Sequence, residues 1–189
     1  MGQEYFKAEV MIMGKDFDLN TYVRKIPDFP KKGVLFYDIT SILINPVAFQ
    51  YCVDSMVEYY QNKKIDAVAA IEARGFLFAA PFAVRLGVPL ILIRKKGKLP
   101  GKTLSKSYSL EYAQAEIEIH REDIPQGKNI LLTDDLIATG GTLRAARALL
   151  SEGGGVVSHI FGVVGLSFFN FKGALEDIPI HTLIEYDSE

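Results

Sequence analysis

Cysteine, net charge and long apolar runs are all scarce in this chain, and each scarcity excludes a class of protein. The only cysteine, Cys52, cannot form an intramolecular disulfide, which fits a reducing compartment and predicts a cytoplasmic location. The formal net charge of −2 gives no electrostatic footprint for nucleic acid or an anionic membrane. No apolar run reaches the roughly 18 residues that a membrane-spanning helix needs. We therefore expect neither a nucleic-acid partner nor a membrane.

The remaining composition is that of an ordinary globular chain. Hydrophobic residues make up 49% of the sequence and charged residues 23%. A chain of 189 residues can bury a substantial core, and no linker, internal repeat or low-complexity tract divides it. A single domain over residues 1–189 is therefore expected. Residues 1–15 hold no long apolar segment before a small-residue cleavage site, so secretion is not indicated.

Two familiar nucleotide-binding loops are missing, although a glycine-rich loop is present. Residues 130–132 form a short apolar run that is typical of a buried parallel strand. Two carboxylates and a loop of small residues follow it, namely Asp134 and Asp135 and then Ala138, Thr139, Gly140, Gly141 and Thr142. The loop lacks the lysine of a triphosphate clamp and the Gly-x-Gly-x-x-Gly spacing of a dinucleotide fold. A strand, a small-residue loop and a helix start still predict a phosphate cradle, because glycines let backbone N–H groups approach an anion.

The paired aspartates narrow the kind of anion that this loop could hold. Carboxylates repel a bare phosphate, but they accept hydrogen bonds from sugar hydroxyls and can approach a bound cation. A phosphate at one end and a diol at the other describe a ribose 5-phosphate. The alternative is a strand-to-helix turn in which Asp134 and Asp135 cap the helix and no ligand binds. The whole string favours the ligand site, whereas a lone glycine pair would favour the turn.

Alternating strand and helix patterns predict an α/β fold. Helices are expected at residues 19–26, 46–62, 76–86 and 142–151, and strands at 65–71, 88–93, 130–132, 156–166 and 180–186. Asn45 before Pro46 is a typical helix start, and Gly87 is a typical helix end. Residues 34–40 are rich in β-forming side chains and predict an edge strand or a lid lining. The alternation implies parallel strands, whose ligands collect beyond the carboxyl ends.

Charged residues follow three of the predicted strands, at 72–75, 94–98 and 134–142. Any one arginine or lysine after a strand is most often simply solvated. Their convergence at one edge of a sheet favours a site, because a pyrophosphate leaving group needs several cations or a metal. Arg74, followed by Gly75 at a helix start, is the best candidate for that role.

Four other features of the sequence have simpler interpretations. Two glycines, a proline and several lysines at residues 97–106 predict an exposed, mobile loop. Strict alternation at residues 115–120 predicts a β-ribbon whose polar outer face carries Glu116, Glu118 and His120. Cys52 lies in a helical pattern and is expected to be a buried structural thiol. Three aromatic side chains are expected in the core or at a subunit interface, with a stacking platform as the alternative: Phe168, Phe169 and Phe171.

The string from Asp134 to Thr142 resembles the phosphoribosyl-pyrophosphate motif of type I phosphoribosyltransferases, in which two acidic residues precede Thr-Gly-Gly-Thr. Four further strings are similar to those of the adenine phosphoribosyltransferases within that family: 29–39 (FPKKGVLFYDI), 72–76 (EARGF), 94–101 (RKKGKLPG) and 108–112 (YSLEY). The resemblance implies the α/β type I phosphoribosyltransferase fold, a central mainly parallel sheet flanked by helices. It also implies a small hood at about residues 16–45 plus the C-terminal segment, a core at about 46–166, and a flexible β-ribbon loop at about 97–115.

The activity implied by the resemblance is purine salvage, in which adenine and 5-phosphoribosyl 1-pyrophosphate give AMP and pyrophosphate. A homodimer and Mg²⁺ are implied as well; the metal would arrive with the substrate, with Asp134 and Asp135 as its possible protein ligands. Glu111 would be the proton donor near the base, and Arg74 would neutralise the departing pyrophosphate. The expected substrate-binding residues are Leu35, Phe36, Tyr37, Glu72, Ala73, Arg94, Lys95, Lys98, Tyr112, Asp134, Asp135, Ala138, Thr139, Gly140, Gly141 and Thr142.

One residue departs from the family pattern. Tyr37 stands where the family usually has arginine or lysine, within the segment whose backbone contacts the base. A position that acts through its main chain tolerates this change, whereas a position that acts through its charge does not. Two other functions compete with the one implied: a phosphoribosyltransferase for another purine or a pyrimidine, and a ligand-sensing transcription regulator. The regulator would need a basic DNA-binding extension, and the first 27 residues show none.

Overall fold

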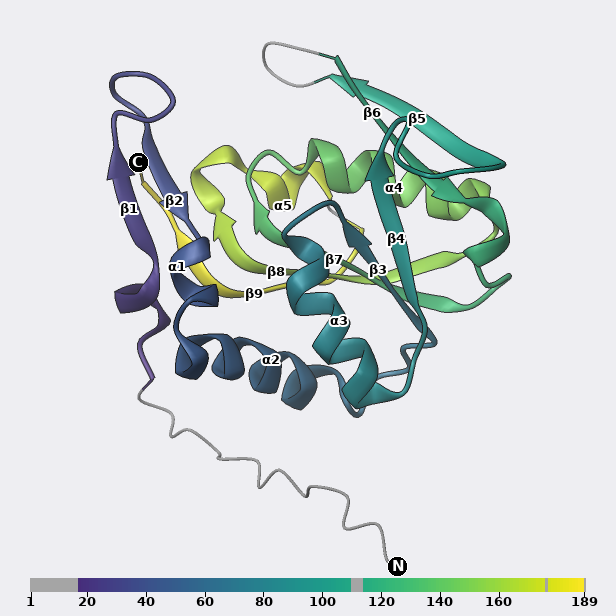
Figure 1. Ribbon diagram of the computed structural model, residues 1–189, viewed down its shortest axis with the longest axis horizontal. Coiled ribbons are helices and arrows are strands. Elements are labelled where there is room, and N and C mark those ends of the chain that lie inside the picture. Colours follow the sequence, from purple (N-terminus) through teal and green to yellow (C-terminus); the bar gives the residue numbers. More distant parts are fainter. Residues whose placement is uncertain (1–16, 110–113, 176, 189) are drawn as a thin grey trace, which may run out of the picture.

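The computed structural model describes residues 17–109, 114–175 and 177–188, and its central feature is a seven-stranded sheet (Figure 1). The strand order is β5-β6-β4-β3-β7-β8-β9. The strands are β3 (Ala67–Ile71), β4 (Leu90–Lys95), β5 (Thr103–Ser109), β6 (Gln114–His120), β7 (Asn129–Ile137), β8 (Val156–Leu166) and β9 (Ile180–Tyr186). Neighbours from β4 to β9 run parallel, whereas β6 is antiparallel to both β4 and β5. The predicted α/β fold with a mainly parallel central sheet is confirmed.

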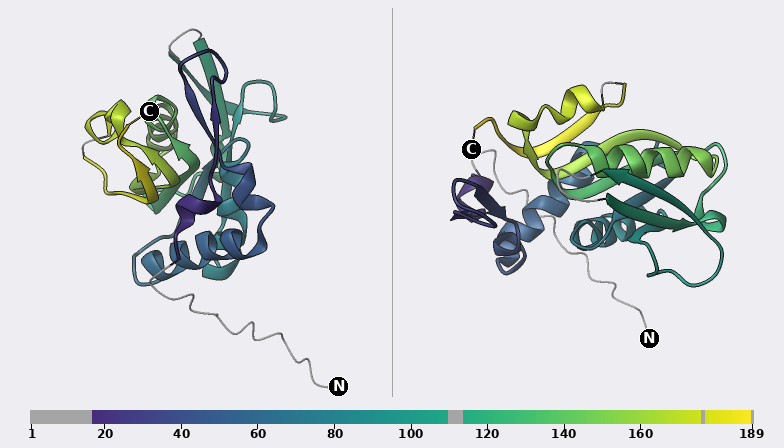
Figure 2. Two further views of the ribbon diagram at one scale, coloured as in Figure 1. Left: turned by 90° about the vertical axis from the view of Figure 1, so that its left-hand side faces the viewer. Right: turned by 90° about the horizontal axis from the view of Figure 1, so that it is seen from above.

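Helices cover both faces of the sheet (Figure 2). Successive residues of β3 show why, because every side chain of this strand is buried and neighbours point to opposite faces. Val68 and Ala70 join one hydrophobic cluster, and Ala67 and Ala69 join the other. The first cluster packs against α2 (Pro46–Tyr60) and α3 (Gly75–Leu86), and the second against α4 (Gly141–Glu152) and α5 (Phe171–Ala174).

The predicted boundaries of the three long helices α2, α3 and α4 agree closely with those observed. The Asn45 side chain accepts hydrogen bonds from the backbone N–H groups of Val47 and Ala48, at 3.1 and 3.0 Å, and so caps α2. Gly87 ends α3 with a φ of 69°, a conformation that glycine adopts without strain. Cys52 lies buried in α2, and burial raises the pKa of its thiol to about 12. It is therefore the structural thiol that its helical pattern predicted.

The predicted helix at residues 19–26 is wrong beyond its first turn. Leu19–Tyr22 forms the short 3-10 helix η1, capped by the Asp18 carboxylate, and Arg24–Pro27 forms strand β1. Strand β1 pairs antiparallel with β2 (Leu35–Asp38) in a separate two-stranded sheet. The residue before a proline is biased toward extended backbone, and pairing with β2 outweighs the helical spacing of the apolar residues. The short helix α1 (Thr40–Leu43) follows β2 and begins at the last residue of the segment predicted to be extended.

The region of the β-ribbon differs from its prediction in two ways. Residues 103–106 belong to β5, so the predicted loop at 97–106 is shorter than expected. Glu118 is buried, with 2% of its surface exposed, although alternation placed it on the polar outer face. The physical reason is that β6 lies between β4 and β5 and is an internal strand. Half-buried Glu116 and His120 fit the expected polar face better than Glu118 does.

The three phenylalanines near the end of β8 have different environments. Phe171 is fully buried in the cluster that contains α4, as the core interpretation predicted. Phe168 and Phe169 lie in the 3-10 helix η3 (Ser167–Phe169) with ring centroids 4.5 Å apart, and Phe169 is exposed.

Within the described part of the chain, no helix is both long and apolar enough to cross a membrane.

Candidate active site

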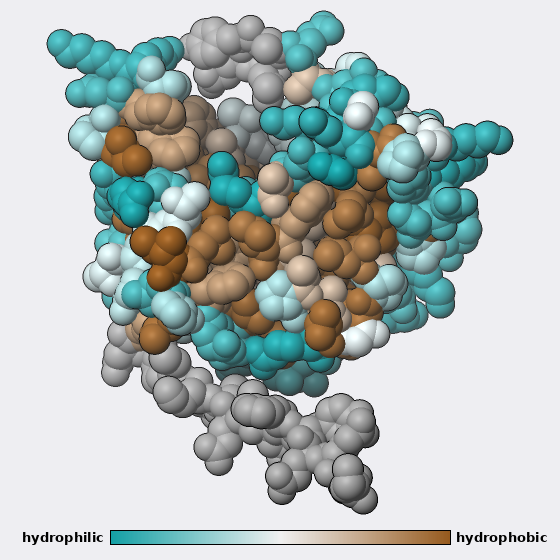
Figure 3. Space-filling model, in the orientation of Figure 1, coloured by the Kyte–Doolittle hydropathy of each residue, from teal (hydrophilic) through white to brown (hydrophobic). Residues whose placement is uncertain are grey.

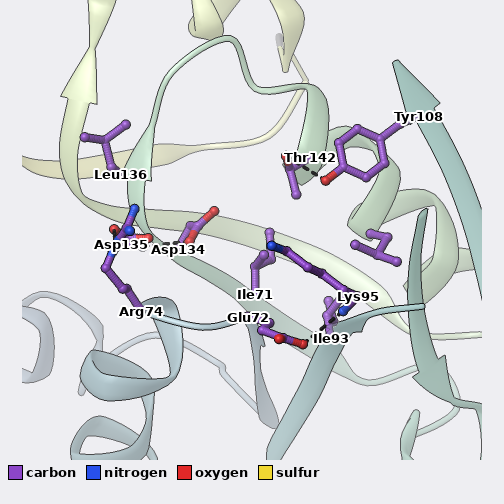
Figure 4. A pocket seen from close by; sticks show the side chains of 11 residues that line it. Ile71, Glu72, Arg74, Ile93, Lys95, Tyr108, Asp134, Asp135, Leu136 and Thr142 are labelled. Carbon is purple, nitrogen blue, oxygen red and sulfur yellow. Dashed lines mark hydrogen bonds and ion pairs between the residues drawn. The ribbon is translucent and has the colours of Figure 1, made fainter. Parts of the chain in front are cut away.

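The carboxyl ends of β3, β4 and β7 meet beside β5 and β6 around a cavity of about 190 Å³ (Figure 4). The three strands are neighbours in the parallel part of the sheet, so their C-terminal residues emerge at the same edge. The cavity is lined by Ile71, Glu72, Arg74, Ile93, Lys95, Tyr108, Ile117, Asp134, Asp135, Leu136 and Thr142. The convergence predicted from the three charged segments is thereby found in the structure.

Arg74 and Asp135 form an ion pair on one side of this cavity, with 2.6 Å between Nε and Oδ2. Asp135 is almost fully buried in β7, whereas about half of the Arg74 side chain is exposed. Burial would lower the pKa of Arg74, but the hydrogen bond and charge of Asp135 outweigh it and raise the pKa. One edge of the guanidinium is thus used internally, and its two Nη groups remain available to an anion.

Asp134 is electrostatically different from its neighbour. Its Oδ1 accepts the backbone N–H of Asp135 at 2.9 Å. Desolvation, followed by the negative charge of Asp135, raises the pKa of Asp134 well above its ordinary value. Asp135 is therefore paired with an arginine, whereas Asp134 takes up a proton more readily than an ordinary aspartate. Such a pair can both donate to and accept from the hydroxyls of a sugar diol.

Gly75 lets α3 begin against the strand that carries these carboxyls. A β-carbon at Gly75 would lie 3.2 Å from the Cα of Asp134 and 3.3 Å from the carbonyl oxygen of Thr133. Both contacts are with backbone that cannot yield cheaply, so glycine permits the close approach. The approach sets Arg74, the residue before the helix, within reach of Asp135.

The small-residue loop forms the start of α4, as predicted. Gly140 has a φ of 78° and directly precedes the helix, whose twelve residues begin with Gly141 and Thr142. The N–H groups of the first helical turn have no partner within a helix, and the helix dipole favours negative charge there. The Thr142 hydroxyl donates to the hydroxyl of Tyr108 at 3.4 Å, which joins this loop to β5 (Figure 4). Ala138 and Gly141 are half-buried, and Thr139 is exposed.

The residues after β3 and β4 are joined to each other as well as to the cavity. The Oε2 of Glu72 accepts hydrogen bonds from Arg94 Nε at 3.1 Å and from the backbone N–H of Lys95 at 3.0 Å. Arg94 also donates to the carbonyl oxygen of Lys98 at 3.1 Å. Arg94 and Lys98 are absent from the cavity lining, whereas Lys95 extends from β4 into it (Figure 4). Ala73 is exposed and does not line the cavity.

The expected base-binding residues of β2 also lie outside the cavity lining. Leu35 is half-buried, and Phe36 packs edge-on against the ring of Phe29 at a centroid distance of 5.0 Å. Tyr37 is buried, stacks on Tyr186 at 4.1 Å, and donates its hydroxyl to the carbonyl oxygen of Ser188. The side chain that replaces the expected arginine or lysine is therefore directed at the C-terminal segment. Glu111 and Tyr112 lie outside the described residues.

Several lining residues were not predicted from the sequence. Leu136 follows the two aspartates and lines the cavity at its margin, and Tyr108 reaches it from β5 (Figure 4). Ile71, Ile93 and Ile117 close the apolar side. Period-2 alternation along β7 could have placed Leu136 on the same face as Asp134. Tyr108 and Ile117 required the pairing of β6 with β4, which no local pattern contains.

Comparisons with known proteins agree with this geometry. The family model described as "Phosphoribosyl transferase domain" matches residues 38–163. The chain is 63% identical to the adenine phosphoribosyltransferase of Treponema denticola over 183 residues, covering 97% of this chain and 96% of that protein. It is similar to the crystal structure of adenine phosphoribosyltransferase from Thermoanaerobacter pseudethanolicus, with a TM-score of 0.85, 43% identity, and coverage of 89% and 98% of the two chains. A Trypanosoma brucei adenine phosphoribosyl transferase in complex with AMP, pyrophosphate and ribose-5-phosphate has a TM-score of 0.81, 27% identity, and coverage of 92% and 82%.

Proposed function

This chain belongs to the adenine phosphoribosyltransferase family, and on that premise we propose roles for its residues, its metal and its assembly. The reaction is the pentosyl transfer from 5-phosphoribosyl 1-pyrophosphate to adenine, which gives AMP and pyrophosphate in purine salvage. The observation that carries this conclusion is the 63% identity over nearly the whole chain. The convergence of Arg74, Asp134 and Asp135 with the loop before α4 gives the reaction a site.

The loop from Ala138 to Thr142 binds the 5-phosphate of the sugar through backbone N–H groups at the start of α4. Asp134 and Asp135 hold the ribose hydroxyls. As the bond from C1 to the pyrophosphate oxygen lengthens, positive charge develops on the sugar ring. The two carboxyls then stabilise the positively charged transition state more than they stabilise the ground state. Such preferential stabilisation is the condition for catalysis.

The departing pyrophosphate receives the electron pair of the broken bond and is met by cations at the other side of the cavity. Arg74 offers its two Nη groups while its Nε stays on Asp135. Lys95 adds a second positive charge from β4. Arg94 and Lys98 act indirectly, by holding the connection between β4 and β5 in place. Their hydrogen bonds are with Glu72, Glu118 and each other.

Mg²⁺ is part of the proposal, and the donor set fits it. Asp134 and Asp135 supply the carboxylate oxygens that this hard cation prefers, and it commonly combines one or two such ligands with substrate phosphates. Among the described residues, no group of three or more His, Cys, Asp or Glu side chains could form a closed cage. Bound with the substrate, the ion supplies neutralisation of the pyrophosphate charge.

The base binds beside Leu136 and bonds to C1 through a ring nitrogen. Leu136 packs against its face, and the backbone of Leu35, Phe36 and Tyr37 reads its edge from β2. A main-chain role at Tyr37 is supported by the direction of its side chain, which faces Tyr186. Glu111 and Tyr112 act from the connection between β5 and β6. Glu111 donates to, or keeps protonated, the imidazole side of adenine, and the proton lost by the nitrogen that bonds to C1 is taken up by the departing pyrophosphate.

A homodimer formed through the face of α2 and α3 completes the proposal. Apolar side chains gather on this face (Figure 3), and the most exposed large ones include Ile44, Leu77 and Val84. Val84 is 81% exposed and borders a groove whose other walls are Pro46, Phe49, Gln50, Val53, Ala80, Pro81 and Arg85. Contiguous apolar surface of this kind is typical of protein–protein contacts.

A cytoplasmic location belongs to the same proposal, because the charged sugar substrate does not cross a bilayer unaided.

The experiment that tests this function compares bases in one assay. Isotope-labelled adenine, hypoxanthine, guanine and xanthine are each supplied with 5-phosphoribosyl 1-pyrophosphate, with and without Mg²⁺. We expect rapid nucleotide formation from adenine alone and its loss when the metal is chelated. Preferred use of another base would overturn the specificity, and turnover that is indifferent to chelation would overturn the role of the metal.

A further inference from the structure

Glu118 is a buried carboxylate that the reaction described above does not use. It lies on β6 opposite Arg94 of β4 and Ser105 of β5, with 2% of its surface exposed. An ionised carboxylate is costly to bury unless several donors satisfy it. A residue in this position therefore requires a physical explanation beyond the alternation of its strand.

The donors come from the connection between β4 and β5. Oε1 accepts the backbone N–H groups of Lys98 and Leu99, both at 2.8 Å. Oε2 accepts the hydroxyl of Thr103 at 3.2 Å and lies 3.6 Å from the Nζ of Lys96. Burial alone would raise the pKa of Glu118, but the hydrogen bonds from Leu99, Lys98 and Thr103 lower it. The carboxylate therefore stays ionised and gathers the ends of this connection onto β6.

The segment that Glu118 holds contains two glycines in open positions. Gly97 and Gly101 have φ values of 84° and 78°, and neither position has a neighbour within 4 Å of where a β-carbon would be. Open glycine positions lower the energetic cost of alternative backbone conformations. Lysines at 96, 98 and 102 also repel one another along the segment.

The same segment is continuous with the cavity. Lys98 donates to Glu118 and accepts from Arg94, and Arg94 donates to Glu72, whose Oε2 also accepts the backbone N–H of Lys95. A chain of hydrogen bonds thus runs from Glu118 through the backbone of Lys98 to the backbone of Lys95, the one lysine of this segment that lines the cavity. The backbone N–H of Lys98 also lies 3.2 Å from the carbonyl oxygen of Lys95, so Glu118 caps the turn that directly follows Lys95.

We propose that Glu118 is a positioning residue for pyrophosphate: it fixes the segment from Lys95 to Thr103 and thereby holds the Lys95 ammonium in the cavity. The inference rests on the proposed placing of the pyrophosphate beside Arg74 and Lys95. It also explains why the lysine-rich string at 94–101 accompanies the site, although Arg94 and Lys98 do not line the cavity.

Three measurements on Glu118→Ala test the proposal: local hydrogen exchange, pyrophosphate binding and steady-state kinetics. Amide hydrogen exchange at Lys98 and Leu99 should accelerate at least tenfold, while amides in β3 and β7 keep their protection. The Kd for pyrophosphate in the presence of Mg²⁺, measured by calorimetry, should rise about tenfold. In the kinetic assay, KM for 5-phosphoribosyl 1-pyrophosphate should rise by a similar factor and KM for adenine should change less than twofold.

Glu116→Gln is the matched control, because Glu116 is the same residue type two positions earlier, half-buried beside Lys96. It should leave all these quantities within twofold of the wild type. Glu118→Gln keeps the shape and one acceptor oxygen, so it should show the same pattern with smaller changes of about threefold, and it decides the matter if Glu118→Ala does not fold. Unchanged exchange at Lys98 and Leu99, or faster exchange with unchanged pyrophosphate binding, would overturn the proposal. Hydrogen exchange and pyrophosphate calorimetry need no turnover, so they still decide the role of Glu118 if an inactive wild-type chain refutes the proposed function.

Discussion

Replacing Arg74 by lysine keeps one positive charge at the cavity but removes the forked geometry of the guanidinium. Nε of Arg74 lies 2.6 Å from Asp135, which leaves both Nη groups free to bind a second anion at the same time. An ammonium has its three donors on one atom, so it can stay on buried Asp135 or follow the pyrophosphate. Arg74→Lys therefore tests geometry at constant charge.

The size of the effect follows from which interaction is lost. The ion pair itself contributes little to the free energy of unfolding, because 49% of the Arg74 side chain is exposed and the pair is screened. Removing a donor aimed at charge that develops in the transition state typically costs about 100-fold to 1000-fold in rate. We expect kcat/KM for 5-phosphoribosyl 1-pyrophosphate to fall about 100-fold, or about 2.7 kcal/mol of transition-state stabilisation, with little change in stability.

Initial rates of AMP formation over a range of 5-phosphoribosyl 1-pyrophosphate concentrations measure this change, with thermal unfolding as the check on stability. Arg147→Lys is the control, because Arg147 makes a bidentate pair with Asp177 on the surface and lies outside the cavity lining. It should retain full activity. If Arg74→Lys keeps kcat/KM within threefold of the wild type, the forked contact is not needed and the reasoning about the two Nη groups is wrong.

Three further predictions concern the carboxyl pair, the phosphate loop and the subunit contact. Desolvation and the charge of Asp135 raise the pKa of Asp134 above 3.8, so the folded chain binds a proton that the unfolded chain releases. The free energy of unfolding should fall as pH rises from about 3.8 through the raised pKa, and urea unfolding of Asp134→Asn should show a flatter profile; parallel profiles would contradict this. Gly140→Ala forces a side chain into a φ of 78° with Leu175 3.2 Å away, which should cost about 1–2 kcal/mol and weaken AMP binding at least tenfold by calorimetry. Gly33→Ala, at a φ of 88° with nothing within 4 Å, should show the backbone cost without the binding defect. Val84→Glu buries a charge if α2 and α3 form the dimer contact, so sedimentation velocity should show a monomer; an intact dimer would place the contact elsewhere.

Local patterns in the sequence were sufficient for much of the fold and for bringing charged residues of three segments to one cavity. Asn45, Gly87 and the loop from Ala138 to Thr142 act through their own backbone and the adjoining helix, so a short window contains the relevant physics. The carboxyl ends of β3, β4 and β7 could be brought together because alternation with helices implies parallel strands.

The features that sequence reasoning missed depend on contacts between distant segments. Glu118 alternates like a surface residue, and its burial depends on β6 lying between β4 and β5. Residues 24–26 have helical spacing, but pairing with β2 makes them a strand. Tyr37 could be interpreted only once Tyr186, almost 150 residues later, was placed against it. Leu136, in contrast, could have been found from the alternation of residues along β7 alone.

The tight approach of Gly75 to the backbone of β7 has a consequence for how such proteins can diversify. Because a β-carbon at Gly75 would lie only 3.2 Å from the Cα of Asp134, a larger residue there would push the start of α3 away from β7. The β1–β2 hairpin and the β5–β6 arm, in contrast, lie outside this contact. β1 and β2 form a separate sheet, and β5 and β6 lie at one end of the strand order of the main sheet. Related proteins can therefore change the nucleobase that they accept through substitutions in the β1–β2 hairpin and the β5–β6 arm. The residues that bind the activated sugar can stay the same.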